Sequence, residues 1–221
     1  MPYFKVRNEN RLVVSNFKVM FSSLKQERSL KKIKRYEAFL YTKTSKPSLH
    51  MVVRNPYHRA LSFYKDKFKS IPLNNRENPT FKWEKPQRVF FPLLGVTNNN
   101  TTQDIADLLT NVSFKTFVSM LTQIYAIDEH INPQCWILNH PNYKLLKTLV
   151  TPEEYLSIYK MENLTEMVDF RFLTGCSLNQ KCNNTQSINI EEDIDHDSIA
   201  NLNRIYQQDF KMFGYSMKSV V

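Results

Sequence analysis

Three segments of the chain have the hydrophobic pattern of β-strands. A short run rich in β-branched residues covers Leu12 to Ser15, and an apolar run that ends on an arginine covers Leu49 to Arg54. Between Tyr155 and Met161 apolar and polar residues alternate, as they do in a strand with one buried face. We therefore expect strands at these three places.

Other segments have apolar residues at helical spacing. The clearest are Phe114 to Ala126 and Asp197 to Met212, where apolar residues recur three and four positions apart. We also expect a basic helix from Val19 to Arg35 and a helix from Tyr57 to Ser70. A further helix should start at Asn163, which can form a capping box with a glutamate three residues later.

The order of these elements predicts the fold class. Strands separated by helices indicate an α/β fold, with a central parallel sheet flanked by helices. A length of 221 residues suits one substantial core, so we expect a single domain over residues 1–221. Residues 71–102 are polar and contain four prolines, which predicts a long loop excursion.

The chain is basic, and its net positive charge favours anionic partners. It has 30 Lys and Arg against 21 Asp and Glu, a net charge of +9, with the excess concentrated in Lys25–Arg35 and Lys65–Lys69. Such a chain attracts polyanions: nucleic acid, an acidic polysaccharide or a multiply charged nucleotide. With only three glycines it contains no GxxxxGKS/T or GxGxxG loop, and no nucleic-acid-binding signature is present.

The cysteines and histidines do not form a recognisable metal motif. Cys135, Cys176 and Cys182 lack the spacing of a disulfide framework or of a Cys-x-x-Cys site, so we expect reduced thiols and no metal. A small loop closed by Cys176 and Cys182, or a zinc site that adds His196, stays open as an alternative.

The segment from Arg54 to Ser62 carries the strongest chemical signal. Asn55-Pro56 ends the strand, and Pro56 suits the first turn of a helix because its missing N–H has no intrahelical partner there. Arg54, Arg59 and Ser62 could converge with the free N–H groups of the helix start on one multiply charged anion. A surface salt bridge of Arg54 is the simpler alternative.

Residues 52–68 resemble the segment with which Golgi-type carbohydrate sulfotransferases bind the 3′-phosphate of 3′-phosphoadenosine 5′-phosphosulfate (PAPS). Arg54 and Ser62 match the arginine and the serine of that family. Further stretches resemble later family motifs in the same order: Asp128–Gln134, Tyr159–Leu164 and Ile205–Tyr215. The resemblance implies a P-loop-kinase-like sulfotransferase fold with PAPS as the donor co-substrate and no metal.

The resemblance also places the family's 5′-phosphosulfate loop after the first strand. Lys18 then matches the family lysine, which lies beside the bridging oxygen of the donor, and Ser22 and Ser23 match its small hydroxyl residues. Hydroxyl and N–H donors at a helix start suit a 5′-phosphate. The chain departs from the family proline and small residues at three positions: Phe17, Met20 and Phe21.

The same resemblance supplies a candidate base. His130 matches the family histidine, and an imidazole is suited to proton transfer near neutral pH. Asp128 or Glu129 could orient it or replace it. Ile131 stands where the family has a tryptophan, and a purely structural histidine is the alternative.

The resemblance implies an enzyme that moves a sulfuryl group from PAPS to a hydroxyl, with a sugar or glycan as acceptor and no nucleic-acid partner. Two alternatives stay open: a nucleotide-binding relative that has lost catalysis, and a basic nucleic-acid-binding protein. The chain shows neither a signal peptide nor an apolar run long enough to span a membrane. We expect a cytoplasmic or otherwise soluble protein, or one of the Golgi lumen if the chain is a trimmed catalytic domain.

Overall fold

The computed structural model describes residues 3–139, 156–177 and 194–219. The chain divides into two compact units, which are described separately. The sheet unit comprises Met1–Asn55, Gln134–Ser187 and Lys211–Tyr215. The helical unit comprises Pro56–Pro133, Ile188–Phe210 and Ser216–Val221.

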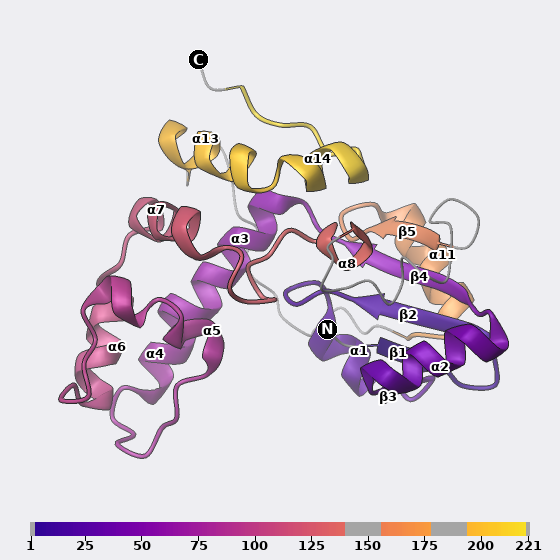
Figure 1. The fold of residues 1–221 in the computed structure, drawn as a ribbon, viewed down its shortest axis with the longest axis horizontal. Coiled ribbons are helices and arrows are strands. Elements are labelled where there is room, and N and C mark those ends of the chain that lie inside the picture. The colour runs from indigo at the N-terminus through magenta and orange to yellow at the C-terminus, as the bar shows by residue number, and fades with distance from the viewer. Residues whose placement is uncertain (1–2, 140–155, 178–193, 220–221) are drawn as a thin grey trace. The chain divides into compact units, whose positions relative to one another are not determined.

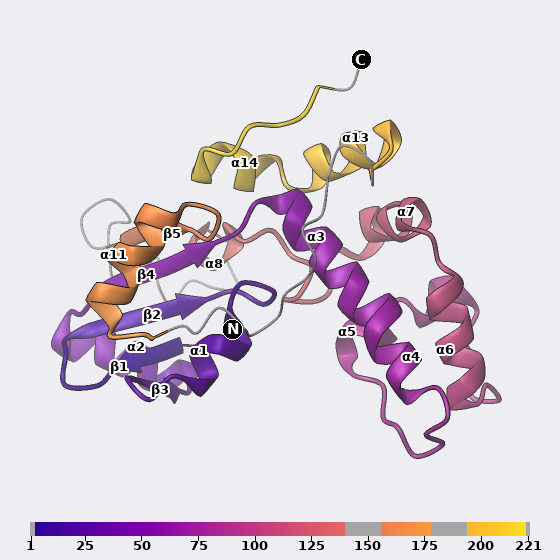
Figure 2. The same cartoon turned by 180° about the vertical axis from the view of Figure 1, so that it is seen from behind.

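In the part that the structure describes, the sheet unit has five strands in the order β3-β1-β2-β4-β5 (Figures 1 and 2). β2 pairs in parallel with β4, and β4 pairs in parallel with β5, whereas β1 is antiparallel to both of its neighbours. Four of the five strands therefore run in one direction. The strands are β1 (Tyr3–Val6), β2 (Arg11–Ser15), β3 (Leu30–Ile33), β4 (Ser48–Val53) and β5 (Leu156–Lys160).

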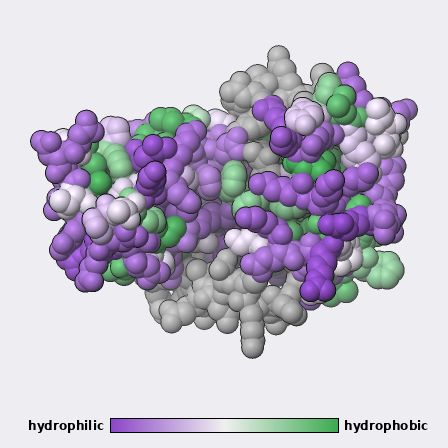
Figure 3. Space-filling view, turned by 90° about the horizontal axis from the view of Figure 1, so that it is seen from below, coloured by the Kyte–Doolittle hydropathy of each residue, from purple (hydrophilic) through white to green (hydrophobic). Residues whose placement is uncertain are grey.

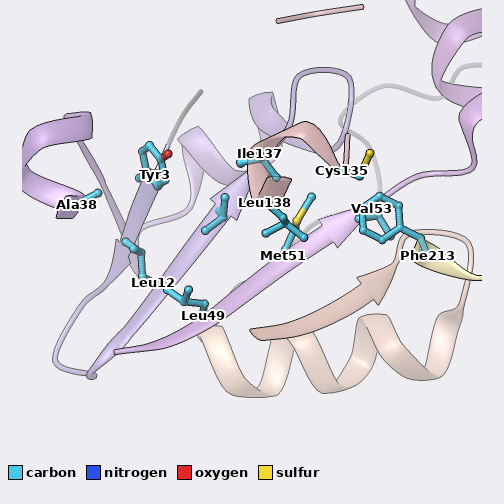
Figure 4. Packing of buried hydrophobic residues seen from close by; sticks show 11 residues of the cluster. Tyr3, Leu12, Ala38, Leu49, Met51, Val53, Cys135, Ile137, Leu138 and Phe213 are labelled. Atoms are coloured by element: carbon cyan, nitrogen blue, oxygen red, sulfur yellow. The ribbon is translucent and has the colours of Figure 1, made fainter. Parts of the chain in front are cut away.

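Alternation along the strands gives the sheet an apolar cluster on each face. Leu12, Leu49 and Met51 belong to the first cluster, together with residues from α2 and α8 (Figure 4). Val13 and Val52 belong to the second, together with residues from α1 and α11. The sheet is thus flanked by helices on both faces: α1 (Phe21–Gln26), α2 (Arg35–Ser45), α8 (Trp136–Asn139) and α11 (Leu164–Thr174).

The described residues of the helical unit form helices around an aromatic core and contain no strand. The ring of Phe117 contacts those of Phe63, Phe68 and Phe90, with centroids 5.1–5.9 Å apart. Its elements are α3 (Pro56–Tyr64), the π-helical η1 (Lys65–Ser70), α4 (Ile71–Asn75), α5 (Lys85–Arg88), the 3-10 helix η2 (Phe91–Leu94), α6 (Thr102–Asn111), α7 (Phe114–Ile124) and α13 (His196–Ile205). The helix α14 (Gln207–Phe213) has residues in both units.

The structure confirms the α/β class and the three expected strands. The expected helix from Val19 to Arg35 is wrong: α1 ends at Gln26, and Leu30–Ile33 form the strand β3. Leu30–Ile33 form a strand because all four residues pair with β1 in an antiparallel ladder. The sequence analysis did not predict β1. Residues 71–102 contain α4, α5 and η2, so the expected loop is partly helical. The single-domain organisation stays a prediction.

One face of the molecule is drawn in Figure 3 with its residues coloured by hydropathy. The face in Figure 3 is mostly hydrophilic, with apolar residues in small separate groups. Among residues 3–139, 156–177 and 194–219, no helix is long and apolar enough to cross a membrane.

Candidate functional site

The order of the strands marks one edge of the sheet as the place for a ligand. From β2 the chain passes through α1 to β3 on one side, whereas β5 pairs with β4 on the other side. Ser15 lies beside Val52, so the carboxyl ends of β2 and β4 are neighbours. Open α/β sheets bind ligands outside such adjacent strand ends, where the connections diverge. The residues that follow these two strands include Lys18 and Arg54.

The loop after β2 has an unusual backbone. Lys18 and Met20 adopt left-handed conformations, with φ of 65° and 53°, whereas Val19 between them has a negative φ. Alternation of this kind turns successive N–H groups toward one side and forms a concavity that suits an anion. The Ser15 hydroxyl holds the loop, because it lies 3.2 Å from the Asn16 carbonyl and 3.3 Å from that of Val19. Strained residues of this type are often found at ligand sites.

Ser22 and Ser23 lie in the first turn of α1, which follows the loop. Ser22 is exposed and Ser23 is half-buried, and the turn contains no acidic residue. The first N–H groups of a helix have no intrahelical acceptor, so this turn can offer both N–H and hydroxyl donors.

The bulky residues of the loop pack against the apolar cluster of α1 and α11. Met20 and Phe21 both contact this cluster. The Phe21 ring lies 6.1 Å from that of Phe4 and 5.5 Å from that of Phe17, measured between centroids. These departures from the family pattern therefore contribute to the core of the sheet unit.

Arg54 lies directly after β4, as the sequence predicted, and reaches the loop after β2. Its Nη1 donates to the Lys18 carbonyl over 3.3 Å, and the residue is half-buried. The structure thus brings together two candidate residues that are 36 positions apart in the chain. Both belong to the sheet unit.

Arg59 and Ser62 belong to the helical unit and are three residues apart on α3, but they differ in burial. Ser62 is half-buried, as is His58 four residues earlier, so both lie on the more open face of the helix. Arg59 is only 2% exposed, and its guanidinium donates to the carbonyls of Asn132 (2.7 Å) and His130 (3.1 Å). In this structure Arg59 supports the turn that contains His130. Its contact with a phosphate stays a prediction.

His130 is oriented by a buried carboxylate. Asp128 Oδ1 lies 2.7 Å from His130 Nδ1 and also accepts the backbone N–H of His130 over 2.9 Å. Lys85 Nζ lies 3.4 Å from Asp128 Oδ2. Burial opposes ionisation of Asp128, but the hydrogen bonds from His130 and the electrostatic attraction of His130 and Lys85 outweigh it and lower the pKa of the carboxyl. A carboxylate kept ionised can hold an imidazole in one orientation.

Lys85 is a residue that sequence reasoning missed. It comes 43 residues before Asp128 and lies on α5, within the stretch expected to be a loop. A basic residue in a polar stretch gives no signal of such a contact, which only the tertiary structure creates.

The described residues contain no group of three His, Cys, Asp or Glu side chains that could hold a metal ion. Cys135 and Cys176 are buried, and burial raises the pKa of the Cys176 thiol. Cys182 lies outside the described residues, so the alternatives that involve it are not tested.

No curated protein and no solved structure matches the chain significantly. A family model described as the sulfotransferase family matches residues 3–216, and this single match includes residues of both units. That family implies PAPS as the donor. The match covers nearly the whole chain, and the chain therefore belongs to the sulfotransferase family, as a PAPS-dependent sulfotransferase.

Proposed function

We propose that the protein transfers a sulfuryl group from PAPS to a hydroxyl of a carbohydrate. One observation carries the proposal: Arg54 contacts the left-handed Lys18 loop at the carboxyl ends of two adjacent parallel strands. An arginine and a concave run of N–H groups at this edge suit a doubly phosphorylated nucleotide.

The donor-binding roles follow the chemistry of each residue. Arg54 would bind the 3′-phosphate through its guanidinium fork, with Ser62 as a second, short donor. The N–H groups of the loop and the hydroxyls of Ser22 and Ser23 would bind the 5′-phosphosulfate. The assignment of Ser62 rests on its match to the family serine.

Lys18 would act on the leaving group. PAPS, when bound, supplies a sulfuryl group on a phosphate leaving group. As the sulfur–oxygen bond to that phosphate breaks, negative charge grows on the bridging oxygen, and the Lys18 ammonium would stabilise it. Such an interaction strengthens toward the transition state and therefore raises turnover more than affinity.

His130 would accept the proton of the attacking hydroxyl. Donation from Nδ1 to Asp128 Oδ1 leaves Nε2 as the proton acceptor, and the carboxylate then stabilises the imidazolium that forms. The acceptor oxygen bonds to sulfur, the bond from sulfur to the leaving phosphate oxygen breaks, and the hydroxyl proton goes to His130. Arg59 would keep the backbone of this turn in place.

A carbohydrate acceptor is the assignment that the resemblance favours. The contacts that choose among carbohydrates should come from residues 71–102, which carry exposed polar and basic side chains such as Lys82 and Arg88.

The test has two steps. Calorimetric titration with 3′-phosphoadenosine 5′-phosphate (PAP) should show binding by the full chain, and labelled PAPS should then transfer sulfate to one member of a panel of oligosaccharides. Binding without transfer to any acceptor would favour a relative that has lost catalysis. Absence of PAP binding would contradict the proposal as a whole.

A further inference from the structure

The backbone around Arg54 is held by side chains from distant parts of the sheet unit. The amide of Gln134 makes two hydrogen bonds to it: Arg54 N donates to Oε1 over 3.0 Å, and Nε2 donates to the Arg54 carbonyl over 2.7 Å. Gln134 has no exposed surface. A buried side-chain amide that pairs with both polar groups of one residue acts like a short piece of neighbouring strand and fixes its position.

Two more side chains hold the residues on either side of Arg54. Glu162 Oε1 accepts the backbone N–H of Asn55 over 2.9 Å, and Glu162 Oε2 accepts the hydroxyl of Tyr215 over 2.9 Å. The same hydroxyl lies 3.4 Å from the carbonyl of Val53. Burial, followed by the negative charge of Glu162, raises the pKa of Tyr215 above its usual range, so the phenol stays a donor.

These contacts meet where the regular sheet ends. Val53 is the last residue of β4, and its carbonyl also accepts the N–H of Met161, which follows β5. Beyond that point the backbone loses its neighbouring strand, and the half-buried polar groups of Arg54 would be costly to leave without partners. Gln134, Glu162 and Tyr215, here called the strand-exit clamp, supply those partners over residues 53–55.

The members of the clamp come from three separate sequence stretches, and the first of these also contains His130. They lie in Asp128–Gln134, Tyr159–Leu164 and Ile205–Tyr215, the later motifs of the family pattern. Together they hold the backbone of residues 53–55, and the middle residue of these, Arg54, also contacts the Lys18 loop. Their shared target is therefore the position of Arg54.

We propose that the strand-exit clamp positions Arg54 for the donor nucleotide, so that Gln134, Glu162 and Tyr215 are positioning residues of the donor site. The inference rests on the proposed role of Arg54 as a phosphate ligand. A fixed backbone removes the part of the guanidinium's freedom that comes from motion of the main chain, so less freedom is lost on binding, which raises affinity without any contact between the clamp and the ligand.

Tyr215→Phe is the sharpest test, because it deletes one hydroxyl and keeps the ring. We expect its Kd for PAP to rise about two- to tenfold, the range for one hydrogen bond. The KM for the donor should rise with it, and the KM for the acceptor should not change. Tyr41→Phe is the matched control, since its hydroxyl contacts Glu9 and Asn10 before the start of β2 and should leave PAP affinity unchanged.

A double-mutant cycle separates positioning from general stability. In the background of Arg54→Ala, Tyr215→Phe should have no further effect on PAP affinity, because the clamp acts through Arg54. An equal loss in both backgrounds would overturn the inference, as would wild-type affinity in the single variant. If Tyr215→Phe does not fold, Glu162→Gln takes its place, with the same expected result in the same cycle.

The outcome also separates this inference from the proposed function. If the wild-type chain does not bind PAP, or if Arg54→Ala binds it normally, the assignment of Arg54 itself fails. If Arg54→Ala loses affinity while the clamp variants keep it, only the positioning role fails.

Discussion

The two units hold their candidate groups by different means. In the sheet unit Lys18 and Arg54 follow strands, and the uncharged side chains of Ser15 and Gln134 form hydrogen bonds with the backbone on either side of them. In the helical unit His130 lies in a turn, and charged side chains fix it, above all Asp128 and Arg59. The first arrangement suits a rigid cradle for an anion, whereas the second keeps one imidazole oriented for proton transfer. Variants in the two units should therefore fail in different steps.

The largest effect is expected in the helical unit. His130→Ala should lower kcat about 10²–10⁴-fold, the usual cost of removing a general base, and should leave PAP affinity unchanged. Initial rates and calorimetry would measure the two quantities. His196→Ala, an exposed histidine of the same unit, is the control. If His130→Ala keeps full activity, Asp128 or Glu129 is the better candidate, and early melting would indicate a structural role.

In the sheet unit Lys18→Ala should lower kcat about 10²–10³-fold, because it removes one charge that stabilises the transition state. PAP affinity should fall much less. Lys46→Ala is a matched control, since Lys46 is also a left-handed lysine but caps the end of α2. A variant at Lys18 that binds PAP poorly and turns over normally would reverse the assigned role.

Arg54→Ala should weaken PAP binding about tenfold to a hundredfold, which corresponds to a charge-assisted hydrogen bond of about 1.5–3 kcal/mol. Calorimetry measures this directly. Arg88→Ala, which removes an exposed arginine of the helical unit, should bind PAP normally. Equal PAP affinities for Arg54→Ala and the wild type would contradict the assignment of the donor site to the sheet unit.

The smallest effect concerns acid stability of the sheet unit. Burial, and then the charge of Arg11, lowers the pKa of His50 from 6.5 to about 4. The unfolded chain therefore binds a proton at His50 near pH 6.5, whereas the folded chain binds it only near pH 4. The free energy of unfolding falls as the pH drops through this window. His50→Gln should melt at a temperature that depends less on pH between 6.5 and 4, whereas the exposed His196→Gln should follow the wild type. If the melting temperatures of the wild type and both variants depended equally on pH, this would contradict the lowered pKa of His50.

Much of the sheet and of the Arg54 corner could be predicted because the signals are local. An apolar run ending in Arg-Asn-Pro predicts both the end of β4 and the start of α3, and the structure has them at Val53 and Pro56. β3 was missed because Leu30 and Ile33 are three positions apart, a spacing that also fits a helix. Only pairing with β1 decides between the two, and the sequence does not show that pairing.

The sequence indicated candidate residues for the site, but it did not indicate the contacts that surround them. The family pattern selected Arg54 and His130, but neither local pattern nor spacing reveals that Gln134 pairs with a residue 80 positions away. Arg59 is a second example, because its place in the motif predicts a phosphate ligand. In the structure it is buried and supports a turn more than 70 positions further along the chain.

The lysines of β3 have a consequence for how the protein behaves at high concentration. β3 ends the described sheet on one side, and its Lys31 and Lys32 are exposed. An outer strand presents unpaired N–H and C=O groups to which another chain can add, and charged side chains discourage that addition. Part of the basic excess of this chain thus protects the sheet from self-association, independently of any attraction for an anionic substrate.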